Sequence, residues 1–417
     1  MKKLFIFISL FVFNLSLLTR ASAQGIPVIT SWMVNTTGLT GYSGITANVQ
    51  TDQFDSNNVY ISCTCIPGYS IGPWTGDPNI PSNQNFVFKI TRSPAQNLAT
   101  PDSVGLGQMA VWTNGVAAYN ASDGMTYNNK GYWHRNAYYF EGASFDNCLG
   151  HPDQHGCYHH HVNPTCLYND ADSTHHSPII GYAFDGYPIY GAYGYSNPLS
   201  VSSIKRMASS YQLRTKMVNR DTLPNGNVLA PADYGPTVNA TYPLGDFMED
   251  YTYVAASGDL DAHNGRYCIT PEYPGGTYAY FVTIDSKLNP VYPYVLGYTY
   301  YGIVQSGNTG PGGGHNVPPG GTKVYTPSGI DEVVNNIKFT IEPNPVTDFA
   351  YIYFDANSDN NVKVTLYNSQ GQLLKTYENW HTSIAYSINM STYPAGMYFL
   401  HLQTEKNYVV QKIVKVQ

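Results

Sequence analysis

The pentapeptide Tyr158-His159-His160-His161-Val162 is the part of the chain whose local structure can be predicted most directly. Gly156 precedes it and Asn163-Pro164 follows it, and these residues favour turns, so a short β-strand is predicted between them. Side chains alternate between the two faces of a strand, with a rise of about 3.3 Å per residue. His159 and His161 are therefore expected on one face, roughly 6.6 Å apart at their Cα atoms, and His160 on the other.

Histidine is concentrated around this strand, since seven of the 12 histidines of the chain lie within residues 151–176. Imidazole is the commonest metal ligand in proteins. Two imidazoles on one strand face can converge on one ion, so we predict that His159 and His161 bind a divalent metal. His151 is the expected third ligand, because it lies in an adjacent loop that can fold back onto the strand. Zinc or copper suits imidazole best, and no organic cofactor is expected. The alternative is a hydrogen-bonded polar pocket without a metal.

Two carboxylates, Asp146 and Asp185, are expected to approach these histidines and are the candidate catalytic residues. A carboxylate can ligate a metal, orient a ligating imidazole or act as a general base. Asp185-Gly186 is equally typical of an ordinary turn. The sequence therefore leaves open whether the protein is an enzyme.

Two classes of function remain. In the first, a metal with an open coordination position makes the protein a hydrolase of unknown substrate. In the second, it is a non-enzymatic surface adhesin or binds extracellular polysaccharide, with Trp74, Trp112 and Trp133 stacking on sugars. Burial in the core is the alternative for these rings. The sequence contains no His-Glu-x-x-His motif and no phosphate-binding loop, which argues against a zincin protease and a nucleotide-dependent enzyme.

The composition is typical of a mainly β protein with few short helices. Charged residues make up only 12% of the chain, which has 38 glycines, 27 prolines and 38 tyrosines. One helix is predicted, Val201–Leu213, from the helical spacing of Ile204, Met207 and Tyr211. The net charge of −7 and the lack of a basic block argue against nucleic-acid binding. Strand-like runs recur at residues 58–61, 86–90, 179–184, 251–255 and 277–284.

The chain begins with a predicted export signal, residues 1–23. Lys2 and Lys3 precede an apolar run, and Ala21-Ser22-Ala23 is a small-residue cleavage site. No other long apolar segment occurs, so no membrane span is expected in the mature chain. An even number of cysteines in an exported chain favours disulfides, but the pairing stays open among Cys63, Cys65, Cys148, Cys157, Cys166 and Cys268.

Three further segments follow the signal. Residues 24–305 are expected to form one β-rich body. Residues 306–336 are rich in Gly and Pro and are predicted to be a flexible linker. Residues 337–417 show clean alternation between turn signals, which predicts a small β-sandwich of about seven strands.

The last segment resembles the C-terminal (Por-type) sorting domain of cargo of the type IX secretion system. The matching motifs are Glu342–Asp348 (Glu-Pro-Asn-Pro-Val-Thr-Asp), Tyr367–Leu374, Pro394–Tyr398 and the final Lys412–Val416. The resemblance implies that the type IX secretion machinery recognises residues 337–417. It also implies export through the periplasm, to the outer cell surface or the medium.

The body resembles the YHYH-domain family over roughly residues 27–297. The matching motifs are Gly150–Pro152, Tyr158–Pro164, Ser177–Gly191 and Thr270–Tyr280. The third position of the naming Tyr-His-Tyr-His motif is His160 here, and the two histidines of one strand face are kept. The resemblance implies a shared fold and a site around these histidines, but no substrate.

Overall fold

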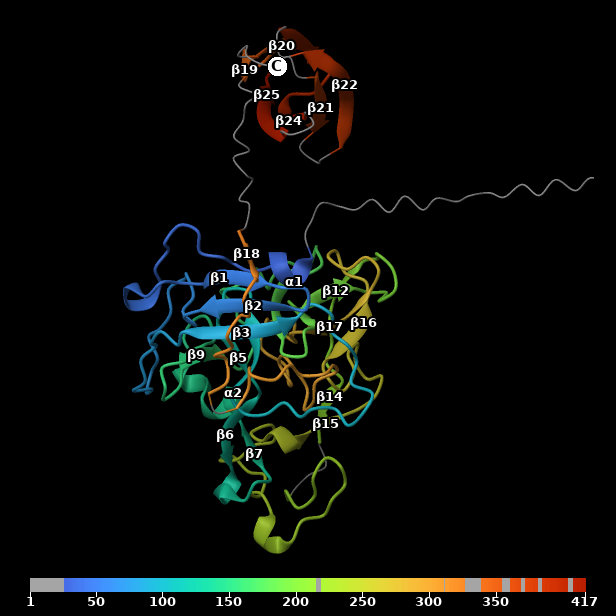
Figure 1. Cartoon of the computed structure of the whole chain (residues 1–417). Helices are drawn as coiled ribbons and strands as arrows, with labels where there is room; N and C mark the ends of the chain where they lie inside the picture. The colour runs from blue at the N-terminus through green and yellow to red at the C-terminus, as the bar shows by residue number, and fades with distance from the viewer. Residues whose placement is uncertain are drawn as a thin grey trace, which may run out of the picture. The chain divides into compact units, whose positions relative to one another are not determined.

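The chain divides into two compact units, one ending at Thr326 and one beginning at Pro327 (Figure 1). This computed structural model describes residues 26–214, 219–310, 312–326, 339–354, 361–368, 372–381, 385–403 and 408–417. The predicted signal peptide, residues 1–23, lies outside the described residues.

A four-stranded antiparallel sheet forms one layer of the first unit. Residues of β3 alternate regularly, with Phe86, Phe88 and Ile90 buried and the residues between them half-buried, as expected for a strand with one face on the core. In spatial order the strands are β18 (Lys323–Tyr325), β1 (Val49–Phe54), β2 (Asn58–Cys63) and β3 (Phe86–Thr91).

The second layer is a mixed eight-stranded sheet. Its central strands are buried along their whole length, which is typical of strands covered on both faces. In spatial order the strands are β16 (Gly265–Cys268), β17 (Thr277–Phe281), β11 (Pro188–Tyr190), β10 (Ile179–Ala183), β4 (Gln108–Trp112), β5 (Ala117–Tyr119), β9 (Tyr158–His160) and β8 (His151–Pro152).

The two sheets share one hydrophobic core. Phe88 of β3 packs against Phe184, which follows β10, with ring centroids 5.3 Å apart. At the far edge of the larger sheet, β9 pairs in parallel with β5 and antiparallel with β8, and His151 lies opposite His159. This edge brings the histidine-rich segment together.

Short ribbons and turns complete the first unit. The ribbons are β6 (Ser122–Thr126) with β7 (His134–Asn136), β12 (Tyr193–Tyr195) with β13 (Ile204–Arg206), and β14 (Tyr211–Leu213) with β15 (Tyr251–Tyr253). The α-helices of the described residues are α1 (Pro27–Thr30) and α2 (Ala137–Phe140), and 3-10 turns cover Tyr42–Gly44, Tyr127–Asn129, Gly142–Ser144, Pro231–Asp233 and Met248–Asp250. The mainly β fold with few short helices is confirmed, and each of the five predicted strand-like runs contains a strand.

The helix predicted at Val201–Leu213 is wrong. The segment forms two separate strands, β13 and β14, which pair with β12 and β15 respectively. Pairing with β12 and β15 satisfies the backbone of these strands and overrides a weak helical spacing of apolar side chains.

The predicted linker, residues 306–336, is wrong in its first part, because the chain up to Thr326 belongs to the first unit. Asn308 is fully buried, where its side chain accepts a hydrogen bond from the Lys89 amide and donates one to the Lys89 carbonyl. Gly314 approaches the sheet so closely that a Cβ there would lie 2.9 Å from the Phe86 ring. Glycines therefore allow this segment to lie against the sheet. Residues 327–336 lie outside the described residues.

The second unit is a β-sandwich with seven strands in its described residues, as predicted. Buried residues of both sheets, such as Ile352 of β20 and Leu400 of β24, form its separate core. One sheet has the order β19 (Phe339–Glu342), β20 (Phe349–Phe354) and β23 (Tyr386–Asn389), and the other the order β22 (Leu373–His381), β21 (Asn361–Asn368), β24 (Gly396–Gln403) and β25 (Tyr408–Lys415).

Two further expectations concern the chain as a whole. Cys148 and Cys166 form a disulfide, and the other four cysteines are buried thiols. In the part of the chain that the structure describes, every helix is too short or too polar to cross a bilayer.

Candidate metal centre

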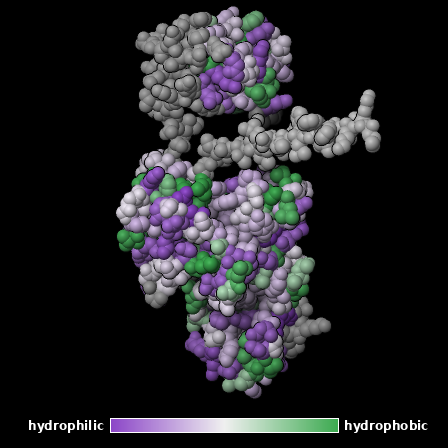
Figure 2. Space-filling model, turned by 45° about the vertical axis from the view of Figure 1, so that its right-hand side comes forward, coloured by the Kyte–Doolittle hydropathy of each residue, from purple (hydrophilic) through white to green (hydrophobic). Residues whose placement is uncertain are grey.

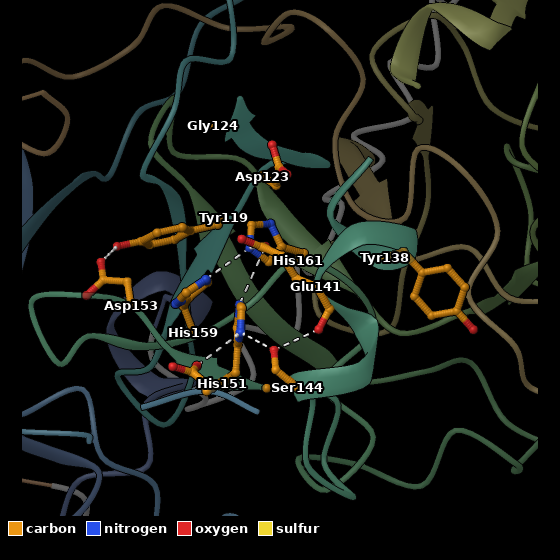
Figure 3. Close-up of polar contacts among 12 residues, drawn as sticks. Tyr119, Asp123, Gly124, Tyr138, Glu141, Ser144, His151, Asp153, His159 and His161 are labelled. Atoms are coloured by element: carbon orange, nitrogen blue, oxygen red, sulfur yellow. Dashed lines mark hydrogen bonds and ion pairs between the residues drawn. The ribbon is translucent and has the colours of Figure 1, made fainter. Parts of the chain in front are cut away.

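Three imidazoles converge at the edge of the larger sheet. His151 lies on β8, His159 on β9 and His161 directly after β9. One side-chain nitrogen from each lies within 4.8 Å of those of the other two, and all three residues are buried (Figure 3). His160 points to the other face of the sheet, where it packs edge-on against Trp112. The structure therefore brings together the three predicted ligands, by the alternation of side chains along β9.

Hydrogen bonds assign the protons of His159 and His161. Nδ1 of His159 lies 2.9 Å from the Cys157 carbonyl oxygen, and Nδ1 of His161 lies 2.5 Å from the Asn120 carbonyl oxygen. A carbonyl only accepts hydrogen bonds, so each Nδ1 carries the proton and each Nε2 presents a lone pair. The two Nε2 atoms are 3.0 Å apart. Two lone pairs that face each other at this distance repel, and a cation between them would relieve the repulsion.

His151 has the same arrangement. The Ser144 hydroxyl donates to the Glu141 carbonyl oxygen, so it can only accept from the His151 Nδ1, which lies 2.9 Å away. This leaves the Nε2 of His151 unprotonated, and among the described residues it has no hydrogen-bond partner. All three imidazoles therefore offer an Nε2 lone pair while Nδ1–H is held by an oxygen, which is the usual state of metal-binding histidines.

Burial keeps two of the three imidazoles uncharged. It lowers the pKa of His151 to about 3, with a further contribution from the neighbouring histidines. Burial also lowers the pKa of His159 well below its usual value. Both imidazoles are therefore neutral at physiological pH, as metal ligation requires.

Glu141 is the carboxylate closest to the imidazoles. It follows α2, and its Oε2 lies 3.2 Å from the His161 Nε2 and 3.7 Å from the His151 Nε2. This oxygen is buried and has no hydrogen-bond partner among the described residues. An unpartnered carboxylate oxygen therefore lies beside imidazole lone pairs, and because all these groups are acceptors the arrangement could hold a cation.

Tyr119 of β5 supports the site from the side. Its ring stacks on the His159 ring, with centroids 3.8 Å apart. Its hydroxyl donates to the Asp153 carboxylate at 3.0 Å. Burial raises the pKa of Tyr119, so the hydroxyl stays protonated. The stack and the hydrogen bond together fix the orientation of the His159 ring.

The imidazoles open into a pocket of about 1040 Å³, which is large enough for a small-molecule substrate. Four carboxylates line it, those of Asp77, Asp123, Glu141 and Asp153. Burial, with the Glu141 carboxylate nearby, raises the pKa of Asp123 to about 6. No lysine or arginine is among the described residues that line the pocket. Its walls are therefore acidic and disfavour anionic substrates.

The structure does not bring Asp146 or Asp185 to the imidazoles, and neither residue lines the pocket. The Asp146 carboxylate accepts hydrogen bonds from the Gly72 and Cys148 amides and the Tyr158 hydroxyl. Asp185 is fully buried and accepts hydrogen bonds from the Tyr280 hydroxyl at 2.5 Å and the Gly302 amide at 2.8 Å. Both carboxylates stabilise loops. Glu141 takes the place that was predicted for them, and no spacing motif in the sequence marks it.

Comparison with known protein families gives one match in each of the two units. Residues 87–293 match the family model described as YHYH protein, and residues 340–416 match the model described as secretion system C-terminal sorting domain. No curated protein matches the chain. Among solved structures, the chain is similar to a DUF3244 family protein with an immunoglobulin-like β-sandwich fold from Bacteroides vulgatus ATCC 8482. The identity is 12%, the match covers 19% of this chain and 94% of that one, and the TM-score is 0.16.

The sorting domain implies that the type IX secretion machinery is a partner, and that the protein reaches the outer cell surface or the extracellular space. The family match covers β3 to β17, including all three imidazoles of the candidate centre. The chain is therefore a secreted or surface-exposed YHYH-family protein with a C-terminal secretion-system sorting domain.

Proposed function

We propose that the first unit binds one divalent metal ion through His151, His159 and His161, and that the site is hydrolytic. The observation that carries the proposal is the convergence of three buried imidazoles whose Nδ1–H groups are each held by an oxygen. The three Nε2 atoms are then free to ligate a metal, and zinc or copper is the cation that three imidazole ligands prefer. On a tetrahedral zinc, two nitrogens lie about 3.3 Å apart, which is close to the 3.0 Å between His159 and His161.

Glu141 has the second role in this proposal. Three histidines leave a coordination position that is open to a ligand or substrate, as in catalytic zinc sites. A divalent cation there would supply Lewis acidity toward a substrate in the pocket. The Glu141 Oε2 faces the same point and can accept a proton from a water molecule beside it. The acidic walls favour a neutral or positively charged substrate.

A serine nucleophile is not supported by the structure. Gly68-Tyr69-Ser70-Ile71-Gly72 has the Gly-x-Ser-x-Gly spacing of a nucleophile elbow. It lies in a loop between β2 and β3, with Ser70 exposed and without the strand-to-helix turn that defines an elbow. The segment therefore lacks the geometry of a serine hydrolase.

The expected polysaccharide-binding face of tryptophans receives no support either. Trp112 and Trp133 are buried in the core, and Trp74 packs against Tyr42 and Tyr158. On the face shown in Figure 2, hydrophobic residues of the first unit are scattered among hydrophilic ones. Large aromatic side chains serve packing at these positions, so metal binding is the function that the described residues favour.

Metal content is the first test. The exported chain, purified without an affinity tag, is expected to contain close to one equivalent of zinc or copper by mass spectrometry. The folded His159→Ala/His161→Ala variant is expected to contain none. A wild-type protein that stays free of metal after reconstitution with each ion would reject the proposal.

Glu141→Gln tests hydrolysis separately from metal binding. The amide keeps the shape of the side chain but cannot accept the proton, so metal content should be unchanged while hydrolysis falls at least about 10²-fold. The assay uses neutral and cationic ester, amide and glycoside substrates. Asp172→Asn, which removes a partly exposed carboxylate outside the pocket, is the control. A metal-loaded wild type that hydrolyses none of them would reject the hydrolytic part and leave metal binding in place.

A further inference from the structure

Two buried thiols lie in contact directly behind the candidate centre. The Sγ atoms of Cys65 and Cys157 are 3.7 Å apart, although the two residues are 92 positions apart in the sequence. Cys65 follows β2 and Cys157 precedes β9, and both are within the hydrophobic core. This contact joins the two sheets of the first unit.

The surroundings select Cys65 over the nearby Cys63 as the partner of Cys157. The backbone of Cys65 has φ of 66°, in the left-handed region, so the chain leaves β2 before this residue. Cys63 is still on the strand, and its side chain packs against Gly115, where an added Cβ would lie 2.5 Å from the Cys63 Cβ. The two cysteines therefore face different neighbours.

We propose that Cys65 and Cys157 form a second disulfide in the exported protein. The route to the cell surface passes through an oxidising compartment, where thiols that meet during folding are oxidised. The two thiols lose two protons and two electrons to the disulfide of a thiol–disulfide oxidase, which leaves as a dithiol, and one S–S bond forms. The sulfurs must approach from 3.7 Å to about 2.05 Å, which changes in side-chain rotation can provide. The reaction precedes closure of the core, because both sulfurs are buried afterwards.

The bond would hold the segment that carries His159 and His161. The Cys157 carbonyl accepts the hydrogen bond from the His159 Nδ1. The Ala117 amide donates to the Cys65 Sγ, and Ala117 pairs with His159 across β5 and β9. Tying Cys157 to Cys65 therefore fixes the backbone around His159. The disulfide itself does not depend on the proposed metal.

Thiol counting on the full chain tests the proposal. The protein is exported to the periplasm of a bacterial host, purified without reductant and denatured in the presence of an alkylating agent. Two thiols per chain, those of Cys63 and Cys268, should be alkylated, and proteolysis should release a linked Cys65–Cys157 peptide. Because Cys63 and Cys65 lie on one peptide, fragmentation must show which of them carries the bond. Four alkylated thiols, or a bond at Cys63 with Cys65 alkylated, would overturn the proposal.

Two matched variants sharpen the count. Cys63→Ser should lower it from two thiols to one, and Cys65→Ser should raise it to three because Cys157 is released. The count is made on denatured protein, so it does not require that either variant folds. Metal content is measured in parallel: four free thiols with metal bound would reject only the disulfide, whereas two free thiols without metal would reject only the metal site.

Discussion

Three single variants, with phenylalanine at position 159, 160 or 161, test whether metal binding follows the alternation of side chains along this segment. The three positions are consecutive, but His159 and His161 face the pocket, whereas His160 lies between Trp112 and Tyr158 on the opposite face. A phenyl ring is planar like imidazole and somewhat larger, and it has no nitrogen that could bind a metal. His160→Phe is therefore a control that makes the same substitution one residue away, on the face opposite to the pocket.

The size of the effect follows from the number of ligands. Structural zinc sites with four ligands bind with apparent free energies of about 10–16 kcal/mol, or roughly 2.5–4 kcal/mol per ligand. The loss of one imidazole should therefore weaken binding by about 10²- to 10³-fold. With free metal at about 1,000 times the wild-type dissociation constant, the ion should stabilise the wild type by about 4.1 kcal/mol. His159→Phe and His161→Phe should retain only about 0.4 to 1.4 kcal/mol of this stabilisation.

The assay is urea denaturation of each variant with zinc and with a chelator. The difference between the two curves isolates the contribution of the metal from any change in the stability of the metal-free fold. Wild type and His160→Phe should show the full difference, and His159→Phe and His161→Phe should lose most of it. An equal loss in all three variants, or full retention in all three, would refute the reasoning from strand alternation.

Three further predictions concern the core of the first unit. Burial raises the pKa of Asp52 on β1 from 3.8 to about 8. Because the folded-state pKa lies above the unfolded value, the stabilisation is present at low pH and is lost as pH rises. The free energy of unfolding of wild type relative to Asp52→Asn should therefore fall by on the order of 3 kcal/mol between about pH 5 and about pH 8, and parallel pH dependence of the two proteins in urea titrations would contradict this. The disulfide inferred above closes a loop of 92 residues. Cys65→Ser should therefore lower the free energy of unfolding by about 4.6 kcal/mol, and Cys63→Ser by much less. Equal losses in the two variants in non-reducing urea titrations would argue against the disulfide. Arg220 and Asp250 form a fully buried ion pair at 2.7 Å. Arg220→Met leaves the Asp250 carboxylate buried without its cation, so it should lower the free energy of unfolding by about 3–5 kcal/mol. Arg220→Met/Asp250→Leu should lower it by less, and urea denaturation can confirm or reverse this ranking.

Several features of the fold were predictable from local patterns. The mainly β class, the C-terminal sandwich and a strand that begins at Tyr158 all follow from turn residues and the alternation of side chains. This strand, β9, ends at His160 and not at the predicted Val162. Features that depend on which segments pair or pack together were not predictable. Val201–Leu213 has helical spacing but forms strands, because Tyr193–Tyr195 and Tyr251–Tyr253 supply pairing partners. The Gly-rich segment after residue 305 carries too few apolar side chains to predict burial, yet Asn308 anchors it to the backbone of β3.

The candidate site divides in the same way. That His159 and His161 point to the same side was predictable from the local sequence, because the two-residue period is a property of the extended backbone alone. Which groups meet them depends on how the rest of the chain folds around the strand. The tertiary structure placed His151 opposite His159 by strand pairing, brought in Glu141 from the end of α2, and assigned Asp146 and Asp185 to loops elsewhere. A carboxylate reaches a site through the path of the whole chain, and no short-range pattern of residues records that path.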